Sequence, residues 1–210
     1  MPGVVVIGAG PGIGNAVARR FAREGLPVAV IARSEATVEA ELALVADSTD
    51  ADALRSALDK VTEQLGVPDV VVYNAALVRA DALGELSVRE HMDAWAVNVV
   101  GAAVAAAHVL PAMARRGSGS FLVTGGMPEA KPEYVSLSLG KAGVRTLISL
   151  LDKQFGDSGV RVASVTVDGG VVPGTAFDPD RIAEHYWWLH ANPDDRRLEV
   201  LFTGQLPGGA

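Results

Sequence analysis

A glycine-rich loop follows a run of β-branched residues near the start of the chain. The loop contains Gly8, Gly10, Pro11, Gly12, Ile13 and Gly14. Glycine adopts turn conformations without a Cβ penalty and lets the backbone approach a ligand closely. A helical pattern over residues 15–24 follows at once, so the loop would open a helix whose first N–H groups carry partial positive charge. This order of strand, loop and helix predicts a seat for a dinucleotide pyrophosphate.

A second set of residues that could contact a cofactor follows the next apolar run, residues 28–32. An acid at the end of that strand would hold a ribose 2′-hydroxyl and repel a 2′-phosphate. The chain instead has Ala32 there, followed by Arg33 and Ser34. A guanidinium pairs bidentately with a phosphate. We therefore expect NADP(H) in preference to NAD(H); the alternative is that Arg33 is a solvated charge at a strand end.

The elements that must position these groups alternate between strands and helices. Apolar runs predict strands over residues 4–7, 28–32, 42–46, 69–73, 121–124, 160–167 and 199–202. Helical spacing predicts helices over residues 15–24, 35–44, 51–65, 86–113, 135–156 and 180–191. Continuously apolar strands are typical of a parallel sheet covered on both faces. We expect one α/β domain over residues 1–210, a Rossmann-type doubly wound sheet of about seven strands in three layers, with a short substrate lid at about residues 171–192.

Composition narrows the class of protein further. The 210 residues carry a net charge of -7 and include no cysteine, which argues against a nucleic-acid surface and excludes disulfides and thiolate sites. The four histidines lack metal-ligand spacing, so no metal is expected. The apolar stretch 94–113 contains Asn98, His108 and Pro111, which favours a helix packed against protein over a membrane span. With no signal peptide recognised, a cytoplasmic protein with a small-molecule substrate is expected.

Small or polar residues occur where several predicted strands end. They are Asp47 and Ser48, Asn74-Ala75-Ala76, Gly125-Gly126 and Asp168-Gly169-Gly170-Val171-Val172. Ligands of open parallel sheets bind at the carboxyl ends of the strands, so these residues should share one site.

With the glycine loop, Asn98 and Lys141-Ala142, these residues resemble the motifs of the short-chain dehydrogenase/reductase family over essentially the full chain. The resemblance implies a nicotinamide cofactor and a set of residues that bind it. The implied cofactor-binding residues, beyond the glycine loop, Arg33 and Ser34, are Asp47 and Ser48 beside the adenine, Asn74, Ala75, Ala76, Lys141 at the ribose, Gly170 and Val172 at the nicotinamide, and Thr175 near its amide or the phosphates.

The catalytic half departs from the family pattern. The family's proton donor is a Tyr four residues before the Lys, and Leu137 stands there. The family's Ser falls at Gly126, so neither usual hydroxyl is present. Asn98 and Lys141 remain as implied catalytic residues. Tyr134, seven residues before Lys141, would share a helix face with it and is a candidate displaced donor; the alternatives are a water donor or a loop aromatic that covers the pocket mouth.

Three functions therefore stay open. The chain is an atypical oxidoreductase on a carbonyl or alcohol, a non-redox enzyme such as a cyclase, lyase or isomerase, or a cofactor-binding sensor or partner subunit without turnover. The aromatic stretch His185, Tyr186, Trp187, Trp188 and His190 either stacks on a substrate or packs a helix on the sheet. Helices 94–113 and 135–156 would form a homodimer or homotetramer interface, as the resemblance implies, or else pack only within the chain.

Overall fold

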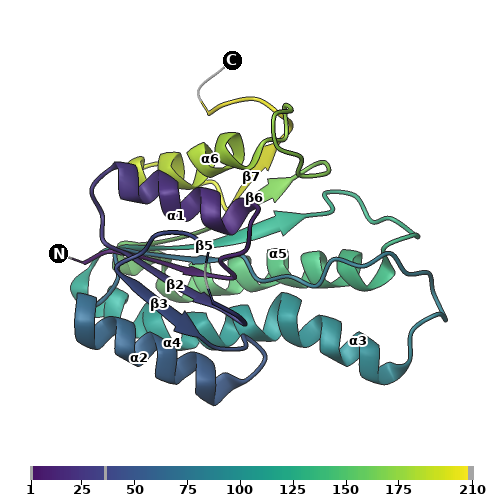
Figure 1. Ribbon diagram of the computed structural model, residues 1–210, viewed down its shortest axis with the longest axis horizontal. Coiled ribbons are helices and arrows are strands. Elements are labelled where there is room, and N and C mark those ends of the chain that lie inside the picture. Colours follow the sequence, from purple (N-terminus) through teal and green to yellow (C-terminus); the bar gives the residue numbers. More distant parts are fainter. Residues whose placement is uncertain (1, 36, 208–210) are drawn as a thin grey trace.

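The computed structural model describes residues 2–35 and 37–207, which form a seven-stranded parallel sheet between two layers of helices (Figure 1). The strand order is β3-β2-β1-β4-β5-β6-β7. The strands are β1 (Val4–Ile7), β2 (Val28–Ala32), β3 (Leu42–Val45), β4 (Val70–Tyr73), β5 (Gly119–Gly126), β6 (Val160–Val167) and β7 (Glu199–Phe202). The helices are α1 (Ile13–Arg23), α2 (Ala51–Leu65), α3 (Val88–Trp95), η1 (Ala96–Val100), α4 (Gly101–Arg116), α5 (Val135–Phe155), η2 (Gly156–Ser158) and α6 (Pro179–Ala191). The expected fold class is confirmed.

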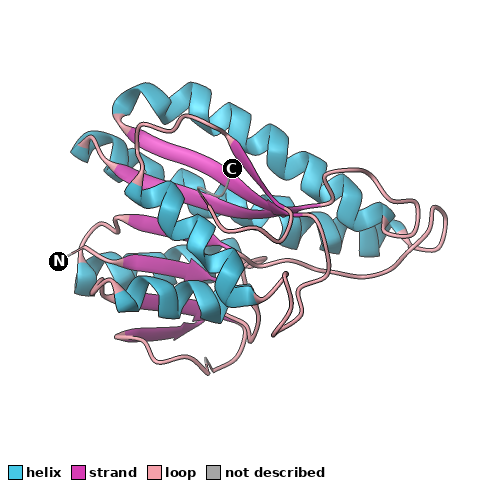
Figure 2. Ribbon diagram, turned by 90° about the horizontal axis from the view of Figure 1, so that it is seen from above, coloured by secondary structure: helices cyan, strands magenta, loops and turns pink. Residues whose placement is uncertain are grey.

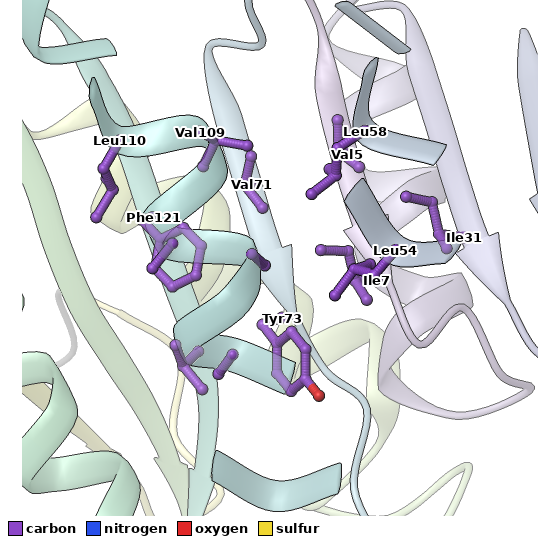
Figure 3. Close-up of a cluster of buried hydrophobic side chains, with 14 of the residues drawn as sticks. Val5, Ile7, Ile31, Leu54, Leu58, Val71, Tyr73, Val109, Leu110 and Phe121 are labelled. Carbon is purple, nitrogen blue, oxygen red and sulfur yellow. The ribbon is translucent and has the colours of Figure 1, made fainter. Parts of the chain in front are cut away.

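The central strands are mostly apolar because both faces of the sheet are covered. Every residue of β1, β4 and β6 is buried. One face packs against α2, α4 and α5, where Phe121 and Tyr73 of the sheet meet Leu110 of α4 and Leu54 of α2 (Figure 3). The other face packs against α1 and α6 (Figure 1). Continuous hydrophobicity of the strands thus follows from the three-layer arrangement.

The helix expected over residues 35–44 is wrong. The described residues of that segment are irregular up to β3, which begins at Leu42. The chain must return there from the end of β2 to the start of β3, a length of about 16 Å for five strand residues. A helix over the nine connecting residues rises only about 13 Å and leaves nothing for the turns. The Glu41 carboxylate instead accepts a hydrogen bond from the Val28 N–H, which ties the connection to the start of β2.

The other helix ends follow their sequence signals closely. Asp50 caps α2, because its carboxylate accepts hydrogen bonds from the N–H groups of Asp52 and Ala53. Ser87 and Glu90 form a capping box at the start of α3.

A long apolar helical stretch runs from α3 through η1 into α4. These 29 residues, Val88–Arg116, have the length and composition of a membrane span, and half of their most apolar window is buried inside the fold. The buried side includes Ala102, Ala106 and Leu110, which pack against the sheet. A core helix that packs in this way can have the length and composition of a membrane span.

Candidate functional site

A cleft of about 840 Å³ opens at the carboxyl ends of the strands. The loops that follow β4 and β5 extend beyond that end of the sheet (Figure 2) and meet each other at the bridge between Asp81 and Tyr134. The cleft is lined by most of the residues singled out from the sequence, namely Gly8, Gly10, Pro11, Gly12, Ile13, Arg33, Ser34, Ser48, Asn74, Ala75, Ala76, Gly126, Tyr134, Leu137, Lys141 and Gly170. Residues as far apart in the sequence as Gly8 and Gly170 therefore converge on one cavity of a size suited to a cofactor.

The glycine loop forms one wall of the cleft, and its glycines differ in purpose. Gly8 has φ +90°, and a Cβ there would overlap the backbone of Ala75. A Cβ on Gly14 would overlap the Gly8 carbonyl. Gly10 and Gly12 have no heavy atom within 4 Å of an added Cβ. The first pair thus closes the turn, and the second pair leaves open space over the backbone.

The N-terminus of α1 faces this open space without a capping side chain. Gly12 is the N-cap residue and makes no side-chain hydrogen bond. The first turn of α1 carries no acidic residue that would neutralise the positive end of the helix dipole. The helix end therefore offers N–H groups and partial positive charge to an anion in the cleft.

Arg33, Ser34 and Ser48 also line the cleft, whereas Asp47 does not. The three lining residues follow β2 and β3, so they lie at the other end of the strand edge from the loop after β5. The Asp47 carboxylate instead accepts hydrogen bonds from the N–H and the hydroxyl of Thr49, each at 2.8 Å. These bonds, the backbone one foremost, lower the pKa of Asp47. The role of Asp47 beside an adenine stays a prediction.

Lys141 lies at the floor of the cleft and is 5% exposed. Its ammonium donates a hydrogen bond to the carbonyl oxygen of Thr124 at 2.7 Å. Burial, helped by the nearby charge of Arg145, lowers the pKa of Lys141 from its ordinary 10.5 to about 8. Among the described residues no carboxylate forms a hydrogen bond or an ion pair with Lys141, so within that part of the chain the cleft holds a desolvated cation without a counter-ion.

Replacing Lys141 by Met is therefore expected to stabilise the fold at neutral pH. Below pH 8 the folded chain carries the full desolvation penalty, roughly 3 kcal/mol for the shift of the pKa. Loss of the bond to Thr124 offsets part of this, which leaves a gain of about 2 kcal/mol in the unfolding free energy. Between pH 8 and 10.5 the unfolded chain binds more protons than the folded one, so wild-type stability rises with pH there. Denaturant unfolding at pH 7 and pH 10 should show the gain shrinking; an equal gain at both pH values would contradict this account.

The positions of the two absent hydroxyls lie beside Lys141. A Cβ built on Gly126 would have the Lys141 Cε as its nearest heavy atom, at 3.7 Å. Leu137 is 3% exposed and lines the cleft one helical turn before Lys141. Tyr134 is the N-cap residue of α5, is half-buried and also lines the cleft. The structure therefore places a phenol in the same cavity as Lys141.

Asn98 lies outside the cleft lining and acts on the loop that forms it. Its side-chain oxygen accepts a hydrogen bond from the Leu77 N–H at 3.0 Å, and its amide donates to the Leu77 carbonyl at 3.4 Å. Asn98 belongs to η1, a π-helical turn, and such turns often occur at functional sites. A Cβ on Gly140 would meet the Asn98 Cβ at 2.8 Å, so α5 packs closely here. Asn98 thus positions one cleft wall through the loop after β4.

The remaining predicted residues lie elsewhere. Val172 and Thr175 do not line the cleft; the Thr175 hydroxyl donates to the Val172 carbonyl at 2.8 Å within their own loop. The described cleft lining contains no residue of α6. Trp187 packs edge-to-face against Phe21, and His190 lies 3.1 Å from the Ser120 hydroxyl. Of the two interpretations of this stretch, the structure therefore supports packing on the sheet and on α1.

Some site residues carry no signal in the sequence. Asp81 is buried, and its carboxylate accepts hydrogen bonds from the N–H and hydroxyl of Ser136. This contact fastens the β4 loop to the start of α5, although 55 residues separate the partners. Arg145 donates to the carbonyls of Gly126 and Met127, and Met127 has φ +47°. A strained non-glycine residue held by a cation beside the cleft is a local feature without a signal in the sequence.

Fold and cleft together define an α/β protein of the dinucleotide-binding class, with its ligand site at the carboxyl ends of a doubly wound sheet. The model of the short chain dehydrogenase family matches residues 3–178. The chain belongs to this family.

Individual relatives agree with the family assignment. An uncharacterized oxidoreductase of Schizosaccharomyces pombe is 30% identical over 192 residues, which cover 87% of this chain and 71% of the relative. A cis-4-hydroxycyclohexanecarboxylate dehydrogenase of Sinomonas cyclohexanicum is 30% identical, with 83% and 73% covered. Among solved structures, an alcohol dehydrogenase of Thermococcus sibiricus complexed with 5-hydroxy-NADP superposes with a TM-score of 0.85 and 28% identity, over all of both chains. Family membership makes this chain an oxidoreductase-type protein whose fold binds a nicotinamide cofactor.

Proposed function

We propose that the chain is an NADP(H)-dependent oxidoreductase of small carbonyl or alcohol compounds, with Tyr134 as a displaced proton donor. The observation that carries the proposal is the shared cleft, in which the open glycine loop, Arg33, Lys141 and Tyr134 all face one cavity. The relative from Thermococcus sibiricus, whose structure contains an NADP derivative, supports the choice of cofactor by analogy.

The residues present fit such a cofactor on physical grounds. The uncapped N-terminus of α1 and the empty space over Gly10 and Gly12 suit a pyrophosphate. Arg33 is exposed at the end of β2, where a guanidinium pairs with a 2′-phosphate. Lys141 lies beside Gly126 in the cleft, and only one hydrogen bond of its ammonium is made within the described chain. Its other N–H groups are free to meet ribose hydroxyls.

The chain's own residues divide the remaining work. A bound nicotinamide would supply or accept a hydride at the carbonyl carbon. The Tyr134 hydroxyl would donate a proton to the carbonyl oxygen, which becomes the alcohol, and would take it back in the reverse direction. The ammonium of Lys141 would favour the charge that develops on that oxygen, because its field is strong inside a buried site. Leu77, Val78 and Leu137 would keep water from the reacting atoms.

Arg33→Ala tests the cofactor choice. The variant is expected to weaken NADPH binding by about ten- to hundredfold, because a charge-assisted pair with the 2′-phosphate is lost. NADH lacks that phosphate, so its affinity should stay nearly unchanged. Fluorescence titration with each nucleotide gives both dissociation constants. Arg55→Ala, an exposed arginine on α2 that does not line the cleft, controls for the change in net charge. Equal losses for both nucleotides would contradict the preference for NADP(H).

Binding without turnover is the second candidate function. The observation that favours it is the pair of side chains at the usual hydroxyl positions, Gly126 and Leu137, neither of which can donate a proton. Wild-type protein that binds NADPH but consumes none with a broad panel of aldehydes and ketones would favour a sensor, a partner subunit or a non-redox enzyme. Absence of binding by either nucleotide would exclude both cofactor-dependent functions.

We also propose that the chain associates with itself through α3, η1 and α5, with the neighbouring α4. Exposed apolar side chains gather on these packed helices, namely Met92, Trp95, Val100, Leu139 and Leu150. Such a cluster marks an interaction surface. Light scattering after size exclusion should show a dimer or tetramer, and the double variant Leu139→Glu/Leu150→Glu should shift the mass to that of the monomer. A wild-type monomer at micromolar concentration would contradict this proposal.

A further inference from the structure

Helix α6 is connected to the glycine loop although it does not line the cleft. Tyr186 of α6 is completely buried, and its hydroxyl lies 2.7 Å from the hydroxyl of Thr124 on β5. Thr124 donates to the side-chain oxygen of Asn74 at 2.7 Å. Asn74 in turn donates through its amide to the carbonyl of Gly8 at 2.8 Å. Four residues from four different parts of the chain thus form one hydrogen-bonded series.

The direction of every hydrogen bond in the series follows from its chemistry. A threonine hydroxyl has one proton, and the Asn74 oxygen can only accept, so the Thr124 proton points to Asn74. The Tyr186 hydroxyl must therefore donate to Thr124. Burial raises the pKa of Tyr186, which keeps it a neutral donor. Because the Asn74 side-chain oxygen accepts from Thr124, the side-chain NH₂ group is what Asn74 presents to the Gly8 carbonyl.

The series ends where the glycine loop is most constrained. Gly8 adopts φ +90°, and its carbonyl lies against Gly14 at the start of α1. The same Thr124 also accepts the hydrogen bond of the Lys141 ammonium through its carbonyl. One strand residue therefore connects the phosphate-facing loop to the buried lysine, and α6 supplies the last donor of the network.

We propose that Tyr186 is a positioning residue of the cofactor site, which acts through Thr124 and Asn74 on the conformation of the glycine loop. This assigns a role to the aromatic helix other than contact with a substrate. The proposal rests on the proposed binding of a nicotinamide cofactor in this cleft for its effect on affinity, but its effect on the loop is independent of any cofactor.

The chain provides a matched control on the same two elements. Ser120 of β5 lies 3.1 Å from His190 of α6, one helical turn further along than the Thr124–Tyr186 pair. Ser120 lies beside the start of β5, away from the cleft, and is buried as Thr124 is. Ser120→Ala therefore removes a β5–α6 hydrogen bond of the same kind without touching the glycine loop.

The test compares Tyr186→Phe, Thr124→Val, Thr124→Ser and Ser120→Ala with wild type. Hydrogen exchange of the nucleotide-free protein reports the amides of residues 8–14, and titration reports NADPH affinity. Exchange in this loop should accelerate about threefold in Tyr186→Phe and about tenfold in Thr124→Val, and NADPH should bind more weakly by similar factors. Thr124→Ser keeps the hydroxyl and should restore both values. Ser120→Ala should lower the unfolding midpoint without changing either.

The outcomes separate this inference from the proposed function. Unchanged loop exchange in Tyr186→Phe and Thr124→Val would overturn the inference, whether or not the protein binds NADPH. Accelerated exchange confined to residues 8–14, in a protein that binds neither nucleotide, would support the positioning role and refute the cofactor proposal. An equal acceleration in Ser120→Ala would show a general loosening of α6 and would also overturn the inference.

Discussion

Tyr134→Phe is expected to reduce kcat/KM for carbonyl reduction by about 10²–10⁴, the range for loss of a general acid. Tyr134 lies at the N-cap of α5, where its backbone is fixed by the Lys131 carbonyl on one side and by the Ser138 N–H on the other. Phe keeps the ring and its packing, so only the hydroxyl group is removed. NADPH affinity should therefore remain near the wild-type value, measured by titration in parallel with steady-state rates.

Solvent deuterium and a second variant sharpen this experiment. If the phenol delivers the proton in the rate-limiting step, the solvent isotope effect of the wild type should disappear in Tyr134→Phe. Ser138 carries another hydroxyl in the same turn, but its oxygen accepts a hydrogen bond from the Lys131 N–H at 3.0 Å, and Ser138 does not line the cleft. Ser138→Ala should therefore be close to wild type. An undiminished rate in Tyr134→Phe would exclude Tyr134 as donor and leave water in that role.

The sequence predicts the structure best where a single physical rule determines it. Uninterrupted apolar runs such as residues 4–7 are typical of a strand buried on both faces, and that layer structure is confirmed. The carboxyl ends of parallel strands lie at one edge, which is why residues as distant as Gly8 and Lys141 converge on the cleft. The failed helix at 35–44 shows the limit, because the span between β2 and β3 overrides a local helical pattern.

Contacts between distant segments could not be predicted from the sequence. Asp81 looks like any loop acid, and its burial against Ser136 depends on how two loops meet. Tyr186 sits in a run of aromatics that suits either packing or ligand contact, and its partner Thr124 lies on another element. Such side-chain pairs depend on rotamers and on the distance between layers, which periodicity does not encode.

Gly126→Ser/Leu137→Tyr is expected to raise carbonyl reduction by about 10²–10³, because the serine adds a hydrogen-bond donor for the substrate oxygen beside Lys141 and the new tyrosine takes over the proton transfer from Tyr134. A serine fits at Gly126, where the nearest heavy atom to a Cβ is 3.7 Å away. A tyrosine at Leu137 extends into a cleft of about 840 Å³. Its phenol would lie one helical turn from the Lys141 stem, on the same face of α5. The rate should then become independent of Tyr134, which the triple variant with Tyr134→Phe measures.

The neighbouring glycine supplies the control for this gain. A Cβ on Gly125 would overlap the Thr166 hydroxyl, so Gly125→Ser should lower stability and leave the rate without any gain. The packing of the sheet thus requires a glycine at position 125, whereas position 126 has room for a side chain. If the double variant folds and binds NADPH with wild-type affinity but reduces no carbonyl faster, missing hydroxyls are not what limits turnover. If the wild type also consumes no NADPH with a carbonyl panel, the cleft is shaped for binding or for a non-redox reaction, and the oxidoreductase proposal is refuted.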